Sequence, residues 1–387
     1  MTDAPHVYVV AAERSGDLLG AALVRSLRGK TGGAVRFSGI GGEALAREGI
    51  KSAIDISDLS IFGWIDGLLA YRRVKDAVAA SVADILACKP DVVVLVDSWG
   101  YTLRVAQGVR AADPSIRLVK YVGPQVFASR PGRAATLAAT VDRLLTIISF
   151  DAPFYERHGL PVTFVGNPTL ERLQPGDGSA FRERHGVAQA APVLTVLLGS
   201  RSSEIRRMYG PFADAVGRLR RHNDALRIVV PLAGPVEDDV RTRIAADPRF
   251  EGAVVVREDE KEDAFAATDI ALACSGTVVT ELATAGVPTV TSYKLGWVTW
   301  ALARAFFLMK AKYISLVNIA ADRELVPEII QLSATGPNLA KAVTRLFEDT
   351  ERRKRLSAAL VETTATMRGD GRASDRAADA VLEQLAE

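Results

Sequence analysis

Short apolar runs alternate with amphipathic stretches along almost the whole chain, and this alternation limits the fold more than any other feature. The runs are about five residues long, as expected for strands buried on both faces of a parallel sheet. The stretches between them carry apolar residues at steps of three and four, the spacing of a helix with one buried face. Strands and helices in alternation build doubly wound α/β domains. The runs lie at residues 7–11, 35–40, 92–96, 118–122, 144–148 and 162–165, and again at 194–198, 228–232, 254–256 and 270–274.

The length of 387 residues is too great for one simple core and suits two domains. A polar stretch around the Pro-Gly-Asp-Gly turn at 175–178 interrupts the alternation and predicts where the domains separate. We therefore predict two Rossmann-like domains that face a cleft, at 1–168 and 192–350, joined by a linker at 169–191. For the helices at 351–387 two arrangements stay open: packing back on the first domain, or exchange within a dimer.

The second domain carries two features that suit an anion. The run at 194–198 ends in a glycine turn at 199–201, and an amphipathic helix follows, so free backbone N–H groups and the positive end of the helix dipole meet there. Arg201 adds a planar, charged fork. A second turn at 275–277 opens a helix carrying Glu281, a carboxylate suited to ribose hydroxyls. Together the two turns predict a diphosphate site, although each alone is also typical of an ordinary strand–helix connection.

Asp97 directly follows the run at 92–96, at the end of a strand where open α/β sheets bind ligands. Its carboxylate is suited to take a proton from an incoming hydroxyl, and the alternative role is to cap the next helix. A carboxylate in one domain and a diphosphate site in the other indicate a nucleotide-sugar glycosyltransferase. No Asp-x-Asp pair follows a predicted strand, so we expect neither a metal nor a cofactor.

Two other functions keep the same architecture. A UDP-sugar 2-epimerase needs several acids and bases around the sugar, but none of the four histidines follows a predicted strand. A non-catalytic lipid- or nucleotide-binding protein remains the other alternative. The net charge of +2, without a polybasic tail, argues against a nucleic-acid partner. Cys88 and Cys274 lie beside apolar runs and fit reduced thiols, and no signal peptide or membrane span is apparent, so we expect a cytoplasmic protein.

Two stretches combine aromatic and apolar residues with flanking cations, at 59–75 and 297–313. Such a pattern is typical of segments that lie at a membrane–water interface, and core packing or a dimer contact is the alternative. The residues expected to contact a membrane are Phe62, Trp64, Leu68, Leu69, Arg72, Arg73, Trp297, Trp300, Phe306 and Phe307.

Several short motifs follow one another from about residue 7 to residue 385: Glu13-Arg-Ser-Gly-Asp17, Asp97, Gly199-Ser-Arg-Ser-Ser-Glu204, Ser275-Gly-Thr277 and Tyr313-Ile-Ser-Leu-Val-Asn318. In this order they resemble the lipid-A-disaccharide synthase family, inverting glycosyltransferases of the two-domain B type. In the first domain, the resemblance implies that Asp97 is the general base. On the acceptor side it points to Glu13, Ser15, Gly16, Asp17, Arg130 and Asn167. In the second domain it implies donor contacts by Gly199, Ser200, Arg201, Glu204, Ser275, Gly276, Thr277, Glu281 and Asn318.

The resemblance implies transfer from a UDP-2,3-diacylglucosamine donor to a 2,3-diacylglucosamine 1-phosphate acceptor, giving a β-1,6-linked disaccharide monophosphate and UDP. It also implies peripheral attachment to the inner membrane and a homodimer with exchanged C-terminal segments. The chain departs from the family pattern on the acceptor side and in the late block that runs from Tyr313 to Gln331. The departures are Phe127, Ser129, Asn167, Val317 and Asp322.

Overall fold

The computed structural model describes residues 4–55, 67–296 and 312–386, with the side chains of residues 67–72 and 235 left out. It divides into two compact units. The first unit comprises residues 1–171 together with 368–387, and the second comprises residues 172–367. The chain therefore leaves the first unit once and returns to it with its last helix.

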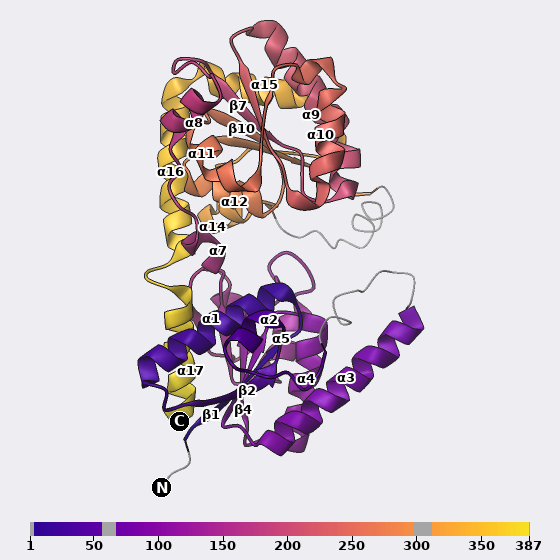
Figure 1. Ribbon diagram of the computed structural model, residues 1–387, viewed down its shortest axis with the longest axis vertical. Coiled ribbons are helices and arrows are strands. Elements are labelled where there is room, and N and C mark those ends of the chain that lie inside the picture. The colour runs from indigo at the N-terminus through magenta and orange to yellow at the C-terminus, as the bar shows by residue number, and fades with distance from the viewer. Residues whose placement is uncertain (1–3, 56–66, 297–311, 387) are drawn as a thin grey trace. The chain divides into compact units, whose positions relative to one another are not determined.

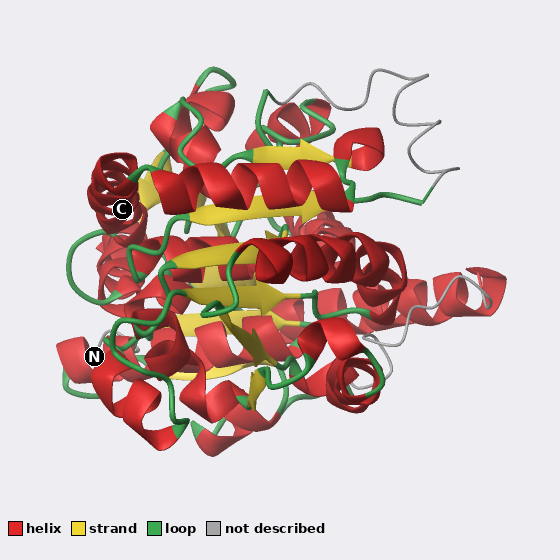
Figure 2. Ribbon diagram, turned by 90° about the horizontal axis from the view of Figure 1, so that it is seen from above, coloured by secondary structure: helices red, strands yellow, loops and turns green. Residues whose placement is uncertain are grey.

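The first unit is built on a six-stranded parallel sheet in the order β2-β1-β3-β4-β5-β6. The central strands are buried along their whole length because helices cover both faces of the sheet (Figures 1 and 2). The strands are β1 (His6–Ala11), β2 (Arg36–Ile40), β3 (Val92–Val96), β4 (Arg117–Tyr121), β5 (Arg143–Thr146) and β6 (Val162–Phe164).

Each face of this first sheet packs against its own group of helices. On one face, Ala377 and Val381 from the last helix join Leu23 and Val24 from the first in a single apolar core. These two helices lie side by side in Figure 1 and are also joined by Ser26 Oγ, which donates to Asp375 at 2.8 Å. The helices of the unit are α1 (Arg14–Thr31), α2 (Glu43–Arg47), α3 (Gly67–Cys88), α4 (Trp99–Ala112), α5 (Gly132–Ala138), α6 (Ala152–Glu156), α7 (Pro168–Glu171) and α17 (Ala373–Ala386).

The second unit has a parallel sheet of the same size, in the order β12-β11-β10-β7-β8-β9. The strands are β7 (Val193–Leu197), β8 (Arg227–Pro231), β9 (Val254–Val256), β10 (Ile270–Cys274), β11 (Thr289–Tyr293) and β12 (Glu328–Ile330). Its α-helices are α8 (Gly178–Arg184), α9 (Ser202–His222), α10 (Glu237–Ala245), α11 (Lys261–Ala266), α12 (Thr277–Thr284), α14 (Leu316–Ala321), α15 (Gly336–Glu348) and α16 (Thr350–Arg368). Short 3-10 turns are η2 (Gly234–Val236), η3 (Pro248–Phe250), η4 (Glu258–Glu260) and η5 (Gln331–Ser333).

The strand order of both sheets reverses once, and this is where an open α/β sheet forms its ligand crevice. In the first sheet the reversal lies between β1 and β3, and in the second between β7 and β10. Two doubly wound α/β domains were predicted, and the structure confirms them. Residues expected to form a linker at 169–191 include α7 and α8, and Phe181 of α8 is fully buried in a core of the second unit.

Among the described residues, no helix is long and apolar enough to cross a membrane. The aromatic stretches lie mostly outside the described part of the chain. Arg73, on the exposed side of α3, is described. Phe62, Trp64, Trp297, Trp300, Phe306 and Phe307 lie outside the described residues, as do the side chains of Leu68, Leu69 and Arg72.

Candidate functional site

A cavity of about 260 Å³ opens at the strand reversal of the second unit. The turns after β7 and β10 form two of its walls, and the segment after β8 forms a third. Lys261, at the start of α11, also lines it. The structure thus brings together the two turns that the sequence selected as anion sites. The predicted donor residues in the wall are Gly199, Ser200, Arg201, Glu204, Ser275, Gly276, Thr277 and Glu281.

The turn after β7 is shaped by a buried carboxylate. Glu204 is only 6% exposed, and its Oε2 accepts a hydrogen bond from the backbone N–H of Ser200 at 3.0 Å. Gly199 has φ +115°, a conformation that favours glycine, and a Cβ there would lie 2.8 Å from the Glu204 side chain. Both the backbone conformation and the lack of space therefore require glycine. Glu204 therefore holds the turn from beneath, a role different from the direct donor contact implied by the resemblance.

Arg201 projects from this turn with most of its surface free. Its side chain is 76% exposed, and Nη1 donates to Glu204 Oε1 at 3.2 Å. A guanidinium has five N–H donors, so this single bond orients Arg201 and leaves the others for a ligand. The guanidinium also lies at the N-terminus of α9, where the helix dipole attracts anions rather than cations. The arrangement is suited to a phosphate or diphosphate.

The turn after β10 carries an ion pair that the sequence did not predict. Glu281 on α12 is 12% exposed, and its Oε2 lies 2.9 Å from Lys261 Nζ. Lys261 also donates to Glu258 Oε1 at 2.6 Å. Burial alone lowers the pKa of Lys261, but its hydrogen bonds to the two glutamates outweigh this and raise it. The ammonium therefore stays charged and fixes Glu281 at the cavity wall.

Cys274 closes the base of the cavity. It is buried, and burial, reinforced by nearby Glu204, raises the pKa of its thiol to about 12. A thiol that keeps its proton at neutral pH is a weak nucleophile. Cys274 therefore serves packing.

In the first unit, Asp97 follows β3 at the strand reversal and is partly exposed. Its backbone is in the left-handed region at φ +50°, and Ser98 follows at φ +42°. Two successive non-glycine residues with positive φ are uncommon and mark a turn that its surroundings hold in place. Ser15 Oγ donates to Asp97 Oδ2 at 3.4 Å, so the first turn of α1 and the turn after β3 meet at this carboxylate.

Lys120 on β4 lies directly beneath Asp97. Its only signal in the sequence is a single cation inside an apolar run. Its side chain is 2% exposed. Burial lowers the pKa of Lys120 to about 7, and the Asp97 and Glu13 carboxylates oppose that change. Nζ donates to the main-chain oxygen of Asp97 and, at 2.8 Å, to Thr102 Oγ1.

Two of the predicted acceptor-side residues are buried. Asp17 is 4% exposed and accepts three backbone hydrogen bonds, from Gly42 at 2.9 Å, Ala44 at 2.8 Å and Leu45 at 3.1 Å. This fixes the start of α2, so Asp17 organises the fold rather than offering its carboxylate to a ligand. Gly16 is buried too, and a Cβ there would lie 3.4 Å from the Val96 carbonyl oxygen.

Glu13 and Arg130, also predicted on the acceptor side, are exposed, and Arg130 has φ +53°. Asn167 is half-buried. Its Oδ1 accepts from Thr169 N at 3.0 Å, and its own N–H donates to the Arg368 carbonyl oxygen at 3.2 Å. Asn167 thus starts α7 and joins the returning C-terminal segment to the first unit.

Asn318 was predicted to contact the donor, but the structure gives it an internal role. It is fully buried, and its Oδ1 accepts from Leu325 N at 2.8 Å and Val326 N at 2.9 Å. Its Nδ2 donates to Val326 O at 2.7 Å and to Glu328 Oε1 at 2.9 Å. The amide therefore ties α14 to β12. Asp322 ends α14 at φ +49°, in the left-handed region that glycine adopts more readily than other residues.

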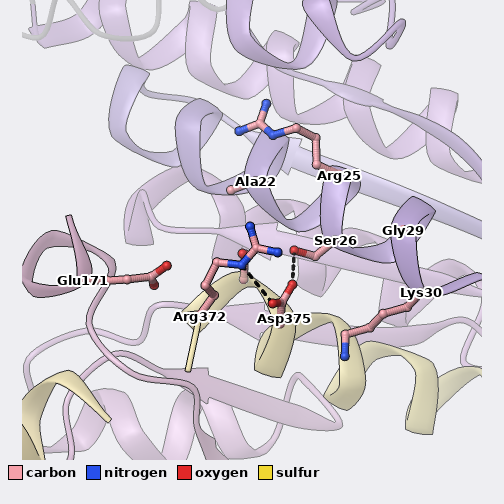
Figure 3. Close-up of a pocket in the computed structure, with 9 residues that line it drawn as sticks. Ala22, Arg25, Ser26, Gly29, Lys30, Glu171, Arg372 and Asp375 are labelled. Atoms are coloured by element: carbon pink, nitrogen blue, oxygen red, sulfur yellow. Dashed lines mark hydrogen bonds and ion pairs between the residues drawn. The ribbon is translucent and has the colours of Figure 1, made fainter. Parts of the chain in front are cut away.

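A second hollow, of about 520 Å³, lies between α1 and α17 in the first unit (Figure 3). Its charged side chains have bonding partners within the first unit. Arg372 Nε donates to Asp375 at 3.0 Å, Ser26 donates to the same carboxylate at 2.8 Å, and Lys30 pairs with Asp379 at 2.7 Å. These contacts join two helices, so we assign the hollow to structure. Within the described residues, no three His, Cys, Asp or Glu side chains are grouped to hold a metal ion.

Comparison with known proteins decides between the alternatives left open by the sequence. The profile of the family described as lipid-A-disaccharide synthetase matches residues 7–382. The chain belongs to this family. The lipid-A-disaccharide synthase of Paramagnetospirillum magneticum is 39% identical over 382 residues, which is 97% of each chain. The predicted family is thereby confirmed, as is the predicted class of enzyme, a glycosyltransferase that forms the lipid A disaccharide from a UDP-sugar donor and a glucosamine acceptor.

Solved structures with the same architecture are more distant. The UDP-GlcNAc 2-epimerase from Neisseria meningitidis, bound to UDP-GlcNAc, has a TM-score of 0.62 at 13% identity, covering 98% of this chain and 100% of that one. The spinosyn rhamnosyltransferase SpnG has a TM-score of 0.52 at 13% identity, covering 98% and 100%. These likenesses show the fold that epimerases and glycosyltransferases share and do not choose between the two activities.

Proposed function

We propose that this glycosyltransferase moves a 2,3-diacylglucosaminyl group from its UDP derivative to the 6-hydroxyl of 2,3-diacylglucosamine 1-phosphate. The products are the β-1,6-linked disaccharide 1-phosphate and UDP. The observation that carries the proposal is the cavity at the strand reversal of the second unit, where an exposed guanidinium and two helix N-termini converge. Such a site suits a diphosphate leaving group better than any other part of the described chain.

The donor's diphosphate binds the backbone N–H groups at the starts of α9 and α12, together with the free donors of Arg201. As the bond between the sugar and the diphosphate breaks, negative charge grows on the leaving phosphate. Prepositioned donors stabilise that charge without a metal ion. Glu281, held by Lys261, accepts from the ribose hydroxyls.

Asp97 acts as the general base. Its carboxylate takes the proton of the acceptor 6-hydroxyl while the oxygen forms its bond to the anomeric carbon, and UDP departs from the opposite face with inversion. The carboxylate is partly exposed and oriented by the turn that bears it. Glu13, Ser15 and Arg130 lie on the same unit and are exposed, so we assign them to the acceptor side.

Acylated substrates are too insoluble to leave a bilayer freely, which favours an enzyme that works at the membrane surface. We propose peripheral attachment to the cytoplasmic face of the inner membrane through the two aromatic stretches, whose described cations include Arg73. Burying a few apolar side chains, each contributing roughly 1.5–3 kcal/mol, gives reversible binding. A homodimer belongs to the same proposal, and within the single chain the last helix, α17, packs on α1.

The test is turnover by purified protein with both lipid substrates, followed by mass spectrometry of the product. Wild-type protein is expected to give the disaccharide monophosphate. Asp97→Asn is expected to abolish turnover while UDP still binds, and Asp224→Asn, an exposed carboxylate of the second unit, serves as the control. Formation of an epimerised donor in place of the disaccharide would overturn the proposed reaction. Full activity of Asp97→Asn would overturn the assignment of Asp97 as the base.

A further inference from the structure

Lys120 is a cation placed where strands of this sheet otherwise bury apolar side chains. It lies within β4, one residue before the end of the strand, and its neighbours in register are Leu95 on β3 and Leu144 on β5. No carboxylate oxygen among the described residues lies within 4.0 Å of its Nζ to form an ion pair. A lysine buried without a close counter-ion is costly. Such a residue calls for an explanation in terms of what its ammonium contacts.

The ammonium contacts the turn that carries Asp97. Nζ donates to the main-chain oxygen of Asp97 and to Thr102 Oγ1, and the Thr102 hydroxyl donates in turn to the same Asp97 oxygen at 2.8 Å. On its other side, Asp97 N–H donates to Tyr121 O, on the strand of Lys120, at 2.8 Å. Hydrogen bonds therefore hold the peptide groups on both sides of Asp97, through its N–H and its carbonyl oxygen. Among the groups that form these bonds, Lys120 is the one that carries a charge.

The turn needs this support because its backbone is in an unfavourable region. Asp97 and Ser98 both have positive φ, and neither is glycine. Residues persist in such conformations only where surrounding contacts over-determine them. Release of the Asp97 carbonyl would let the turn relax and redirect the carboxylate. A general base is effective only within hydrogen-bond reach of the proton it takes.

We propose that Lys120 is a positioning residue for the acceptor-activating step, and that its charged ammonium clamps the Asp97–Ser98 turn so that the carboxylate points at the acceptor hydroxyl. The proposal rests on the proposed function, since it assumes that Asp97 is the base. Lys120 itself does not touch substrate, because it is buried beneath the turn.

The charge of Lys120 depends on pH near neutrality. The groups that act on it are Asp97, at the end of β3, and Glu13, before α1, and both favour the ammonium form against the effect of burial. Thr102 of α4 is neutral, and the register neighbours on β3 and β5 are apolar. Above the pKa of about 7, the amine loses one donor and its attraction to both carboxylates. Turnover should therefore decline on the alkaline side as Lys120 loses its proton.

The experiment compares pH profiles of kcat for wild type, Lys120→Gln, Lys120→Met and Lys120→Arg, with Lys341→Met, an exposed lysine of α15, as the control. UDP affinity is measured in parallel by calorimetry. We expect Lys120→Met and Lys120→Gln to lower kcat about tenfold or more at pH 6.5, to lack the alkaline limb and to bind UDP normally. Lys120→Arg, which stays charged, should move the limb upward by at least about one pH unit.

Wild-type kcat and pH profile in a folded Lys120→Met or Lys120→Gln protein would overturn the proposal. An equal loss of UDP binding and kcat would overturn it too, because that result marks general damage to the fold. If one Lys120 variant fails to fold, the pH profiles of the other two still decide. The proposed function is separated by Asp97→Asn: an inactive Asp97→Asn with a normal Lys120→Met refutes the role of Lys120 alone, whereas an active Asp97→Asn refutes the base itself.

Discussion

Asp151 offers a sharp quantitative test of the electrostatics in the first unit. The residue precedes α6 and is fully buried. Its Oδ2 accepts from Thr146 Oγ1 at 3.2 Å, and its Oδ1 has no hydrogen-bond partner among the described residues. Burial raises the pKa of Asp151 from 3.8 to about 7, and the Thr146 hydrogen bond only partly opposes this. Folding therefore favours the protonated form of this carboxyl group.

The sign of the pH effect follows from proton binding. Between pH 3.8 and about 7 the folded state binds more protons at Asp151 than the unfolded state, so this residue lowers stability as pH rises. The cost is about 2 kcal/mol at pH 5 and about 4 kcal/mol at pH 8, with about 1.36 kcal/mol for each pKa unit. Asp151→Asn removes this dependence. Relative to wild type, the variant should thus gain about 2–3 kcal/mol of stability between pH 5 and pH 8.

The assay is urea unfolding at the two pH values, following the transition that the substitution moves, since two units need not unfold together. Any fixed cost of burying the new amide group cancels in the comparison, because it is present at both pH values. Asp224→Asn, which is exposed, should show no such difference. The quantity compared is the difference in unfolding free energy between Asp151→Asn and wild type. If this difference is the same at pH 5 and pH 8, within about 0.5 kcal/mol, the argument that Asp151 is buried in its neutral form is refuted.

Three further predictions concern the second unit. Arg201→Ala should weaken UDP binding about 10- to 100-fold, because a charge-assisted hydrogen bond contributes roughly 1.5–3 kcal/mol. Binding is measured by calorimetry, with Arg221→Ala, at the far end of α9, as the control. An unchanged affinity of Arg201→Ala for UDP would contradict the diphosphate site. Glu204→Ala should also weaken UDP binding, because the Ser200 N–H loses its acceptor, and a normal affinity would mean that the turn holds itself. Asn318→Leu should lower the free energy of unfolding by roughly 2–4 kcal/mol, because the buried N–H groups of Leu325 and Val326 lose their acceptor, and the affinity for UDP should change little. Unchanged stability with weakened UDP binding would instead make Asn318 a donor contact.

The sheets were largely predictable because a strand that is buried on both faces appears in the sequence as a run of apolar residues. The run at 92–96 coincides with β3 and the run at 270–274 with β10. β11 escaped prediction because it contains Thr289, Thr291 and Ser292, which are buried but polar. Their hydroxyls donate to backbone carbonyls, at 2.9 Å, 3.2 Å and 2.6 Å. Only the folded structure supplies those acceptors, so the local pattern resembled a loop.

The candidate site was predictable in location but not in the roles of its members. A glycine turn between a strand and a helix is visible in sequence, and so is the carboxylate after β3. Whether an acidic or amide side chain faces a ligand or the backbone depends on contacts far along the chain. Asp17 accepts from residues at 42–45, and Asn318 bonds residues at 325–328. Lys261 meets Glu281 only because α11 and α12 line the same cavity.

The two units solve one physical problem in the same way. A side chain that must meet a ligand is partly exposed, and an exposed side chain on a turn loses orientation unless something beneath it is fixed. In the second unit a buried anion, Glu204, holds the turn that bears the exposed cation Arg201. In the first, a buried cation, Lys120, holds the turn that bears the carboxylate of Asp97. Each supporting charge has the opposite sign to the group it supports, so it attracts that group as well as its backbone. The cost of burying Glu204 and Lys120 is therefore best understood as the cost of orienting Arg201 and Asp97.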